Sequence, residues 1–269
     1  MKQLLLYPLC LGVASFGYTN TSDTTDQVPA LADSTAISDT IAISVVEAIV
    51  VDTSITIDSI TGDTIAQIPM RLSEEDYQIV AERLGIEVAV IKAVVEVEAG
   101  HAHCGFGEEN LPIINFDVKI FKRFASRNGI DLSSYRKTHA VVFSKPDIRK
   151  YGSKQAAQWA RVNAACEIDS ITSIEGTFWG MFQIGGFNWK KCGASSISEF
   201  YKAMCESEHA QLEAFANFLV SCNMVEALKK KNWNQFAYRY NGPKYKSRGY
   251  HTKLARAYKK TFQILIDNP

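Results

Sequence analysis

The stretch Val90-Ile91-Lys92-Ala93-Val94-Val95-Glu96-Val97-Glu98-Ala99-Gly100 decides how the rest of the chain is interpreted. Its apolar residues recur at the spacing of an amphipathic helix, and Gly100 is a typical residue at which a helix ends. Glu98 follows three apolar residues of the stretch by three, four and seven positions. Because these spacings place side chains on one side of a helix, Glu98 is predicted to share the apolar face.

Two carboxylates in this stretch are predicted to meet opposite environments. Glu96 follows Lys92 by four positions, a spacing that favours a solvated ion pair. Glu98 leaves the last turn of the apolar face, where desolvation raises the pKa of a carboxyl group. An acid that stays protonated near neutral pH is what glycosidic bond cleavage requires. The structural alternative is that Glu98 caps a core helix and reaches solvent beyond Gly100.

The composition of the chain separates its charges. The 269 residues are 46% hydrophobic, enough for one good core with an appendage. Residues 21–70 contain eight acidic residues and no Lys or Arg, whereas 71–269 contain 28 of the 29 basic and 21 of the 29 acidic residues. Within that part, residues 227–262 hold eleven basic residues and no acidic one. The sequence thus predicts a basic working domain behind an acidic leader.

Residues 1–19 resemble a targeting segment. Lys2 precedes an apolar run from Leu4 to Ala14, and small residues follow where a signal peptidase could cut. The run is too short to span a bilayer comfortably, so we expect no stable membrane span and an exported protein, periplasmic or secreted. Cys10 raises the alternative of a lipid anchor, although bulky residues precede it. An apolar strand of a cytosolic protein is the remaining alternative.

Residues 20–70 are predicted to be a low-complexity linker, and residues 71–269 a single mostly α domain. The linker contains no aromatic residue and is dominated by Thr, Ser, Asp and Ile, which argues against a core of its own. In the domain, Ser73 and Asp76 predict a capping box and a helix to about residue 84. Further helices are expected at 116–126, 153–168, 196–204, 207–221, 223–230 and 252–265. We find no convincing run of strand alternation there.

A second informative stretch is Trp179-Gly180-Met181-Phe182-Gln183-Ile184-Gly185-Gly186-Phe187-Asn188. Its glycines allow the backbone to approach a ligand closely. Its aromatic rings alternate with amides, a combination that suits the C–H faces and hydroxyl rims of a carbohydrate. A third stretch, Tyr238 to Tyr245, places an Asn-Gly-Pro turn between tyrosines. Taken alone, each stretch is more typical of aromatic residues packed around a turn than of a binding site.

Taken together and in this order, these stretches resemble the N-acetylmuramidase family of phage-endolysin-type peptidoglycan hydrolases. That family is related to goose-type lysozymes and lytic transglycosylases. The resemblance covers roughly residues 71–265 and is carried by Glu96-Val97-Glu98, Phe116 to Phe121, Trp179 to Asn188, Cys192-Gly193, Glu206-Ser207-Glu208 with Gln211-Leu212, and Tyr240 to Tyr245. It implies a lysozyme-like catalytic domain that cleaves the bond between N-acetylmuramic acid and N-acetylglucosamine in peptidoglycan.

The resemblance also implies roles for single residues. Glu98 falls on the family's catalytic acid, and Asp117 falls on its second acidic position, where Glu is usual. The shorter side chain, together with Lys119 in place of the usual His, leaves the second role open. Gln183 and Tyr240 match positions that line the sugar cleft. The other residues of these stretches that we expect to bind substrate are Trp179, Phe182, Asn188 and Asn241.

Three ways of relieving the charge that builds on the sugar remain open. A water held by Asp117 gives hydrolysis, the substrate's own acetamide can assist, and intramolecular attack gives the anhydro product of a lytic transglycosylase. The alternative from another class is a non-catalytic peptidoglycan-binding module, whose basic residues 227–262 would attract the carboxylates of stem peptides. Such a module does not need an acid on an apolar face. No base-reading motif accompanies the basic residues, so nucleic acid is not expected.

The cysteines and histidines do not predict a metal site. His101-Ala102-His103-Cys104 lacks the distant second pair of a structural zinc site, so we expect neither metal nor cofactor. Five cysteines remain if Cys10 leaves with the signal, and four of them could pair in an exported protein. Cys192 matches a cysteine common in family members made in the cytosol, which favours a buried thiol there. The protein is expected to be a monomer.

Overall fold

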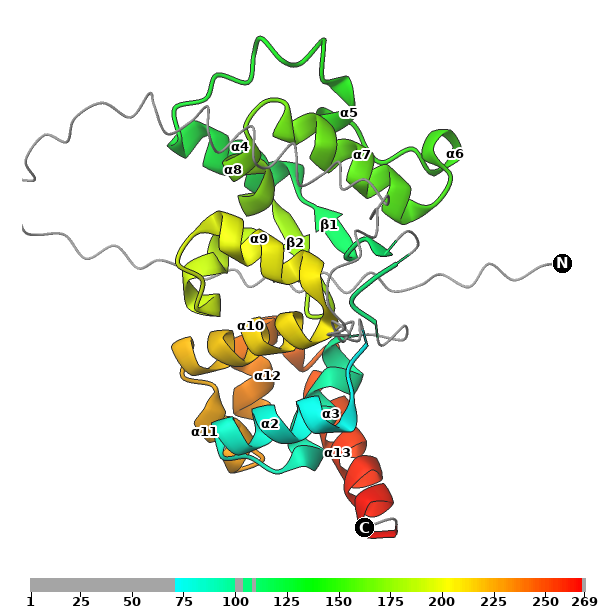
Figure 1. Ribbon diagram of the computed structural model, residues 1–269, viewed down its shortest axis with the longest axis vertical. Helices are drawn as coiled ribbons and strands as arrows, with labels where there is room; N and C mark the ends of the chain where they lie inside the picture. Colours follow the sequence, from blue (N-terminus) through cyan, green and yellow to red (C-terminus); the bar gives the residue numbers. More distant parts are fainter. Residues whose placement is uncertain (1–70, 100–103, 108–109, 268–269) are drawn as a thin grey trace, which may run out of the picture. The chain divides into compact units, whose positions relative to one another are not determined.

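The computed structural model describes residues 71–99, 104–107 and 110–267 (Figure 1). The signal-like segment 1–19 and the linker 20–70 predicted from the sequence lie outside these residues. The described chain divides into two compact units. The first unit contains the described residues up to 115 and those from 178 onward, and the second contains 116–177. Both units are mostly helical, which confirms the predicted fold class.

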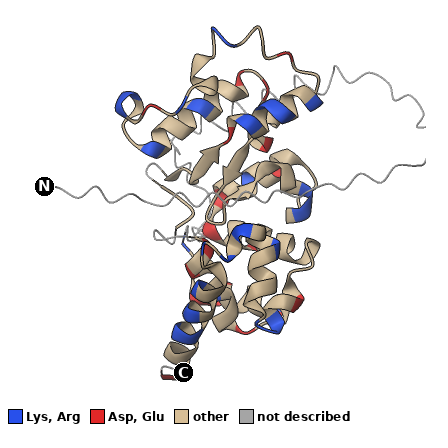
Figure 2. Ribbon diagram, turned by 180° about the vertical axis from the view of Figure 1, so that it is seen from behind, with Lys and Arg blue, Asp and Glu red and all other residues tan. Residues whose placement is uncertain are grey.

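The first unit combines two N-terminal helices with the helices that follow residue 185. Its elements are α2 (Glu74–Leu84), α3 (Val88–Glu98), β3 (Ile184–Gly185), the 3-10 helix η2 (Gly186–Cys192), α9 (Ile197–Glu206), α10 (Glu208–Ser221), α11 (Val225–Lys229), α12 (Trp233–Asn241), the 3-10 helix η3 (Pro243–Tyr245) and α13 (Tyr250–Asp267). Helix α3 packs against α2 and α13, and α10 packs against α2, α9 and η2. Lys and Arg recur along α13 (Figure 2).

The second unit is built around its longest helix. Its elements are α4 (Val118–Arg127), α5 (Ala140–Phe143), α6 (Ile148–Tyr151), α7 (Lys154–Cys166) and α8 (Ser170–Glu175). Helix α7 packs against α5, α6 and α8, while α4 packs against α8. None of the helices in the described ranges of either unit has the length and hydropathy needed to span a bilayer.

A small sheet forms where the chain passes between the units. Strand β1 (Ile114–Phe116) contains the first passage and β2 (Thr177–Trp179) the second. The strand order is β1-β2-β3, and β2 runs antiparallel to β3. Phe178 lies opposite Gly185, and Trp179 lies opposite Ile184. Because the chain reverses at Gly180 between these strands, the Gly-rich stretch forms a hairpin.

The start and end of α2 follow the sequence prediction. The Ser73 hydroxyl accepts a hydrogen bond from the Asp76 N–H at 3.2 Å, and the Asp76 carboxylate accepts one from the Ser73 N–H at 2.7 Å. This reciprocal pair is the predicted capping box. Gly85 ends the helix with φ 62°, a left-handed conformation that glycine adopts at little cost. The chain then turns into α3.

Several elements differ from the sequence prediction, which also did not include the short helices α5, α6 and α8. The strands β1, β2 and β3 are each only two or three residues long, too short to show alternation. The helix predicted at 116–126 begins at Val118, because Phe116 ends β1 and Asp117 serves as the N-cap. Trp233–Asn241 forms α12, whereas only a turn was predicted near its end. Gly242 and Pro243 follow the end of this helix, since Gly242 is its C-cap and Pro243 begins η3.

A ladder of aromatic rings joins the two motif stretches in the core of the first unit. Phe215 of α10 is fully buried and stacks on Phe182, with ring centroids 4.0 Å apart. The same Phe215 ring meets the edge of Tyr240 at 5.6 Å. Tyr240 in turn stacks on Phe236 at 5.7 Å. Helix α10 therefore holds the Gly-rich hairpin and the end of α12 against one another.

Candidate functional site

Glu98 is the last residue of α3 and meets the last residue of α12. Its Oε1 accepts a hydrogen bond from Asn241 Nδ2 at 3.2 Å. Asn241 is buried, whereas Glu98 keeps part of its surface open to solvent. A buried amide thus holds the carboxyl group of a residue that is itself only half-buried.

The helix places Glu98 there for the reason that the sequence indicated. Ile91, Val94 and Val95 of α3 are all buried, with exposed fractions of 3% or less. Glu98 continues this face, so its carboxyl group emerges among protein atoms and not into open solvent. The predicted apolar face of the helix is confirmed.

Burial raises the pKa of Glu98 to about 7. The hydrogen bond from Asn241 and the positive charge of Lys253 act in the opposite direction, because both stabilise the carboxylate. Desolvation is the largest of the three effects, and this confirms the predicted rise in pKa. Near neutral pH the group is therefore present both as acid and as carboxylate, as a general acid requires.

The ion pair predicted between Glu96 and Lys92 is wrong. Lys92 pairs with Glu74 of α2, and Glu96 pairs with Lys260 of α13 at 3.2 Å. The physical reason is packing, since α2 and α13 both lie against α3 and offer partners from other helices. Such partners lie outside the reach of an argument based on spacing within one helix.

Tyr240 and Gln183 both donate side-chain hydrogen bonds to backbone carbonyl groups in or beside the Gly-rich hairpin. The Tyr240 hydroxyl donates a hydrogen bond to the Phe182 carbonyl at 3.0 Å. Burial raises the pKa of Tyr240 well above its ordinary value, and the charge of Glu98 adds to this rise. Gln183 has a positive φ of 48°, and its Nε2 donates to the carbonyls of Gly180 at 2.9 Å and Ile113 at 3.2 Å. The structure thus brings Glu98, Tyr240 and Asn241 together beside the Gly-rich hairpin.

The other predicted substrate-binding residues occupy different positions. Trp179 is fully buried, and its ring meets the edge of Tyr201 at 5.2 Å. Phe182 is only 4% exposed because it stacks on Phe215. Asn188 lies on η2 and is half-buried. Contact of these residues with a sugar stays a prediction, and the two aromatic side chains have a packing role in the structure.

Asp117 belongs to the second unit, where it caps α4. Its Oδ1 accepts hydrogen bonds from the backbone N–H groups of Lys119 at 2.7 Å and Ile120 at 3.1 Å. Its own N–H donates to the Gly176 carbonyl at 2.9 Å. Burial lowers the pKa of the nearby Arg161, and the charge of Asp117 opposes that shift. Asp117 therefore has a structural task, and its Oδ2 is the oxygen that the cap does not use.

Two residues of α10 bind the backbone of the Gly-rich hairpin and of the loop after α3, and no role was predicted for them. Glu208 is 2% exposed and accepts hydrogen bonds from the N–H groups of Gly105 at 2.8 Å and Leu72 at 3.0 Å. Gln211 accepts one from the Met181 N–H at 2.7 Å. Both residues tie loops to the start of α10. The available signal was a charged residue and an amide three positions apart, on the side of the helix that also carries the apolar Leu212 and Phe215.

Lys253 is the further residue that the sequence did not single out. It is exposed in the first turn of α13, and its charge lowers the pKa of Glu98. In the sequence it was only one of the eleven basic residues in 227–262. A long-range electrostatic partner of this kind has no signature in spacing.

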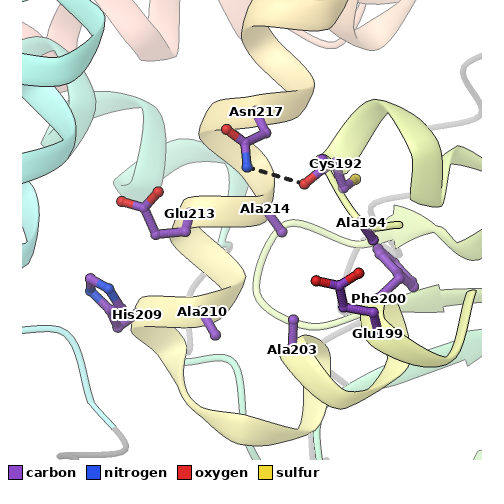
Figure 3. A pocket seen from close by; sticks show the side chains of 11 residues that line it. Cys192, Ala194, Glu199, Phe200, Ala203, His209, Ala210, Glu213, Ala214 and Asn217 are labelled. Carbon is purple, nitrogen blue, oxygen red and sulfur yellow. Dashed lines mark hydrogen bonds between the residues drawn. The ribbon is translucent and has the colours of Figure 1, made fainter. Parts of the chain in front are cut away.

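A cavity of about 300 Å³ lies between η2, α9 and α10 in the first unit (Figure 3). Small residues form much of its lining, and Asn217 Nδ2 donates to the Cys192 carbonyl beside it at 3.2 Å. Glu199, His209 and Glu213 also line it. None of the predicted catalytic or substrate-binding residues is among its lining residues. The cavity is therefore separate from the site around Glu98.

The cysteines of the described residues are free thiols. Cys192 is buried, as predicted, and burial raises its pKa to about 12, which makes it unreactive. The described ranges contain no group of three or more His, Cys, Asp or Glu residues placed to hold a metal ion. His101 and His103 lie outside those ranges.

Comparison with known proteins gives two matches. Residues 87–262 match the family model described as Muramidase: N-acetylmuramidase. The chain is also similar to the crystal structure of the Burkholderia AP3 phage endolysin, with 33% sequence identity and a TM-score of 0.63, over 74% of this chain and 75% of that chain. No curated protein matches the chain. The matched residues 87–262 include Glu98, Asp117 and Tyr240.

Proposed function

The chain belongs to the N-acetylmuramidase family, and we propose that it cleaves the bond between N-acetylmuramic acid and N-acetylglucosamine with Glu98 as the general acid. It is a lysozyme-type glycoside hydrolase that acts on peptidoglycan, and its fold is lysozyme-like. The observation that carries the assignment of Glu98 is its environment. The carboxyl group of this half-buried residue has a pKa raised to about 7 and an amide donor on Oε1.

In the proposed reaction, protonated Glu98 gives its proton to the glycosidic oxygen as the bond to the sugar breaks. The carboxylate that results keeps the hydrogen bond from Asn241 Nδ2 and the favourable charge of Lys253. Both groups stabilise negative charge that appears during the step, so they assist departure of the proton. Burial acts before the step by keeping the acid protonated.

Asp117 is proposed as an accessory group that holds the attacking water through Oδ2. The support is the cap geometry, which employs Oδ1 and orients the side chain at the start of α4. A second carboxylate that activates water favours hydrolysis, because intramolecular attack does not require such a group. Because Asp117 also caps α4, its replacement is expected to affect both the stability of that helix and the activity.

The substrate-binding residues are proposed to act in two groups. Gln183, Asn188 and Asn241 are amides that can meet the hydroxyl and acetamide groups of a sugar. Trp179, Phe182 and Tyr240 are proposed to shape the binding surface from behind, because their rings pack in the core and Tyr240 holds the Phe182 carbonyl. This division separates contact with substrate from support of the hairpin.

The enzyme acts on the cell wall. We propose that residues 1–19 direct its export, that residues 20–70 tether the catalytic domain 71–269, and that its activity lyses bacteria. The support for export is the sequence pattern alone, namely a positive start, an apolar run and small residues after it. The chemistry proposed for Glu98 requires neither metal nor cofactor.

The bond cleaved is tested by product analysis. Purified peptidoglycan is digested, and the soluble products are reduced with borohydride and identified by mass spectrometry. The proposal requires N-acetylmuramic acid at the reducing end, which reduction converts to the corresponding muramitol. Products with a non-reducible 1,6-anhydro ring would overturn hydrolysis, and reducible N-acetylglucosamine would overturn the choice of bond. Retained wall binding without soluble saccharide would favour the binding module.

A further inference from the structure

We propose that Lys253 is a specificity-determining residue whose ammonium group binds a carboxylate of the peptidoglycan strand beside the bond that is cleaved. The proposal rests on the proposed function of Glu98. It assigns to this one side chain a preference for acidic glycan over a neutral polymer of N-acetylglucosamine. The carboxylate could come from the lactyl group of muramic acid or from a stem peptide.

The backbone and a neighbouring ring place the Lys253 side chain. Its N–H donates to the Gly249 carbonyl at 3.0 Å, which fixes it in the first turn of α13. Its Nζ lies 5.5 Å from the centroid of the Tyr250 ring. Tyr250 is only 5% exposed, so the ring is a rigid platform. A cation held over an aromatic face is oriented without losing its charge.

The charge of Lys253 is not paired with an acidic group in the part of the chain that the structure describes. Two other glutamates lie at or just before α3, and both have lysine partners. Glu87 pairs with Lys231, and Glu96 pairs with Lys260. Among the described residues, no Asp or Glu oxygen lies within 4.0 Å of the Lys253 ammonium group. Lys253 is exposed, and Glu98 is partly accessible. A substrate carboxylate at this point would give Lys253 an anionic partner that the described residues do not provide.

Lys253 is also coupled to Glu98, which places it near the chemistry. Helix α13, which carries Lys253, packs against α3, which ends at Glu98. The charge of Lys253 also lowers the pKa of Glu98, as expected for two groups within electrostatic reach. A saccharide whose glycosidic oxygen meets Glu98 therefore brings its substituents near Lys253. Peptidoglycan strands carry carboxylates on those substituents, and chitin does not. A charge-assisted hydrogen bond of this kind changes affinity by about tenfold.

Binding of a carboxylate would also change Glu98. Neutralisation of Lys253 removes the effect that lowers the pKa of Glu98, so the acid holds its proton more firmly in the complex. The titratable group that faces Glu98 from α12 is Tyr240. Two other charged groups on the packed helices pair with residues of α3, since Lys260 of α13 pairs with Glu96 and Glu74 of α2 pairs with Lys92. Lys253 is the charged group that acts on Glu98, and a substrate carboxylate would neutralise it.

The test compares three variants of the full chain on charged and neutral substrates. Lys253→Gln removes the charge, Lys253→Arg restores it, and Lys259→Gln removes an exposed charge from the same helix as the control. The substrates are peptidoglycan, peptidoglycan whose carboxylates have been amidated, and peptide-free glycan strands with free lactyl carboxylates. Initial rates give KM and kcat for each, and the variants are also compared for binding in the inactive Glu98→Gln background.

We expect Lys253→Gln to raise KM for peptidoglycan about tenfold and to leave KM for the amidated substrate unchanged. Lys253→Arg should restore KM, and Lys259→Gln should not alter it. Persistence of the effect on peptide-free strands supports the lactyl group, and its loss there supports a stem peptide. An equal effect of Lys253→Gln on amidated and native peptidoglycan, or no effect on either, overturns the proposal. The binding comparison decides this even if Glu98 proves not to be the acid.

Discussion

Asn241 Nδ2 donates a hydrogen bond to Glu98 Oε1 at 3.2 Å, although the two residues lie 143 positions apart in the sequence. Each of them is the last residue of its helix, α3 for Glu98 and α12 for Asn241. The pair therefore depends on where both helices end as well as on how the core packs. It joins the motif that carries the acid to the motif that carries the Asn-Gly-Pro turn.

The activity is expected to fall as the pH rises through about 7. Only the protonated form of Glu98 can donate a proton, and its pKa is raised to about 7 by burial. Above that pKa, kcat/KM should lose about tenfold per pH unit. Initial rates on soluble peptidoglycan fragments between about pH 5 and about pH 9 measure this limb. A rate that stays constant to the upper end of that range would rule out Glu98 as the acid.

Glu98→Gln is expected to stabilise the folded protein at alkaline pH. Burial raises the folded-state pKa above its ordinary value of 4.5, so ionised Glu98 costs the folded state free energy. This cost is absent below 4.5, grows between 4.5 and about 7, and is complete above that pH. The variant should therefore raise the free energy of unfolding by about 1–3 kcal/mol near pH 8 and by little near pH 4.

Urea denaturation at the two pH values measures this difference, with Glu96→Gln as the matched control. Glu96 lies two positions away and loses only a solvated ion pair with Lys260. The control should change the free energy of unfolding by no more than about 1 kcal/mol at either pH. If Glu98→Gln had the same effect at both pH values, burial would not be the cause of the raised pKa.

Asn241→Leu is expected to move the alkaline limb of kcat/KM to higher pH. The Asn241 amide favours the carboxylate form of Glu98, so its removal raises the pKa of that group further. The maximal rate should also fall by about tenfold, because the carboxyl group loses the donor that orients it. Asn234→Ala, on the exposed side of α12, is the control and should leave the limb in place. A shift toward lower pH would contradict the sign assigned to the hydrogen bond.

Gly180→Ala is expected to destabilise the protein more than Gly129→Ala. Both glycines have a positive φ, 67° for Gly180 and 74° for Gly129. A Cβ on Gly180 would lie 2.6 Å from Gln211, whereas nothing lies within 4 Å of one on Gly129. The backbone cost is about 1 kcal/mol for each, and the contact should add about 1–3 kcal/mol for Gly180. Equal losses in thermal denaturation would show that Gln211 moves aside freely.

The environment of Glu98 was predictable because it depends on one helix. The apolar residues of α3 and the position of Glu98 on their face are local properties of the sequence, and helix periodicity reports them directly. The capping box of Ser73 and Asp76 is local in the same sense. The family resemblance then connected Glu98 with Tyr240 and Asn241, which no local pattern could do.

The partners of Glu98 and Glu96 were not predictable from periodicity. Lys253 and Lys260 come from α13, and the choice of that helix is made by packing across the first unit. The burial of Trp179 could not be predicted from the sequence pattern either. An aromatic residue beside glycines suits a sugar site and a tight hairpin equally well, and the contact with Tyr201 decides for the core.

The most direct test of Glu98 as the general acid is the release of soluble saccharide from purified peptidoglycan by Glu98→Gln. Asp117→Asn is assayed beside it, and thermal denaturation and wall sedimentation show that both variants fold and bind. We expect Glu98→Gln to release no fragments while it still binds the wall, and Asp117→Asn to lose less activity, since it is proposed as an accessory group. Release by Glu98→Gln at the rate of the unaltered protein would contradict the account.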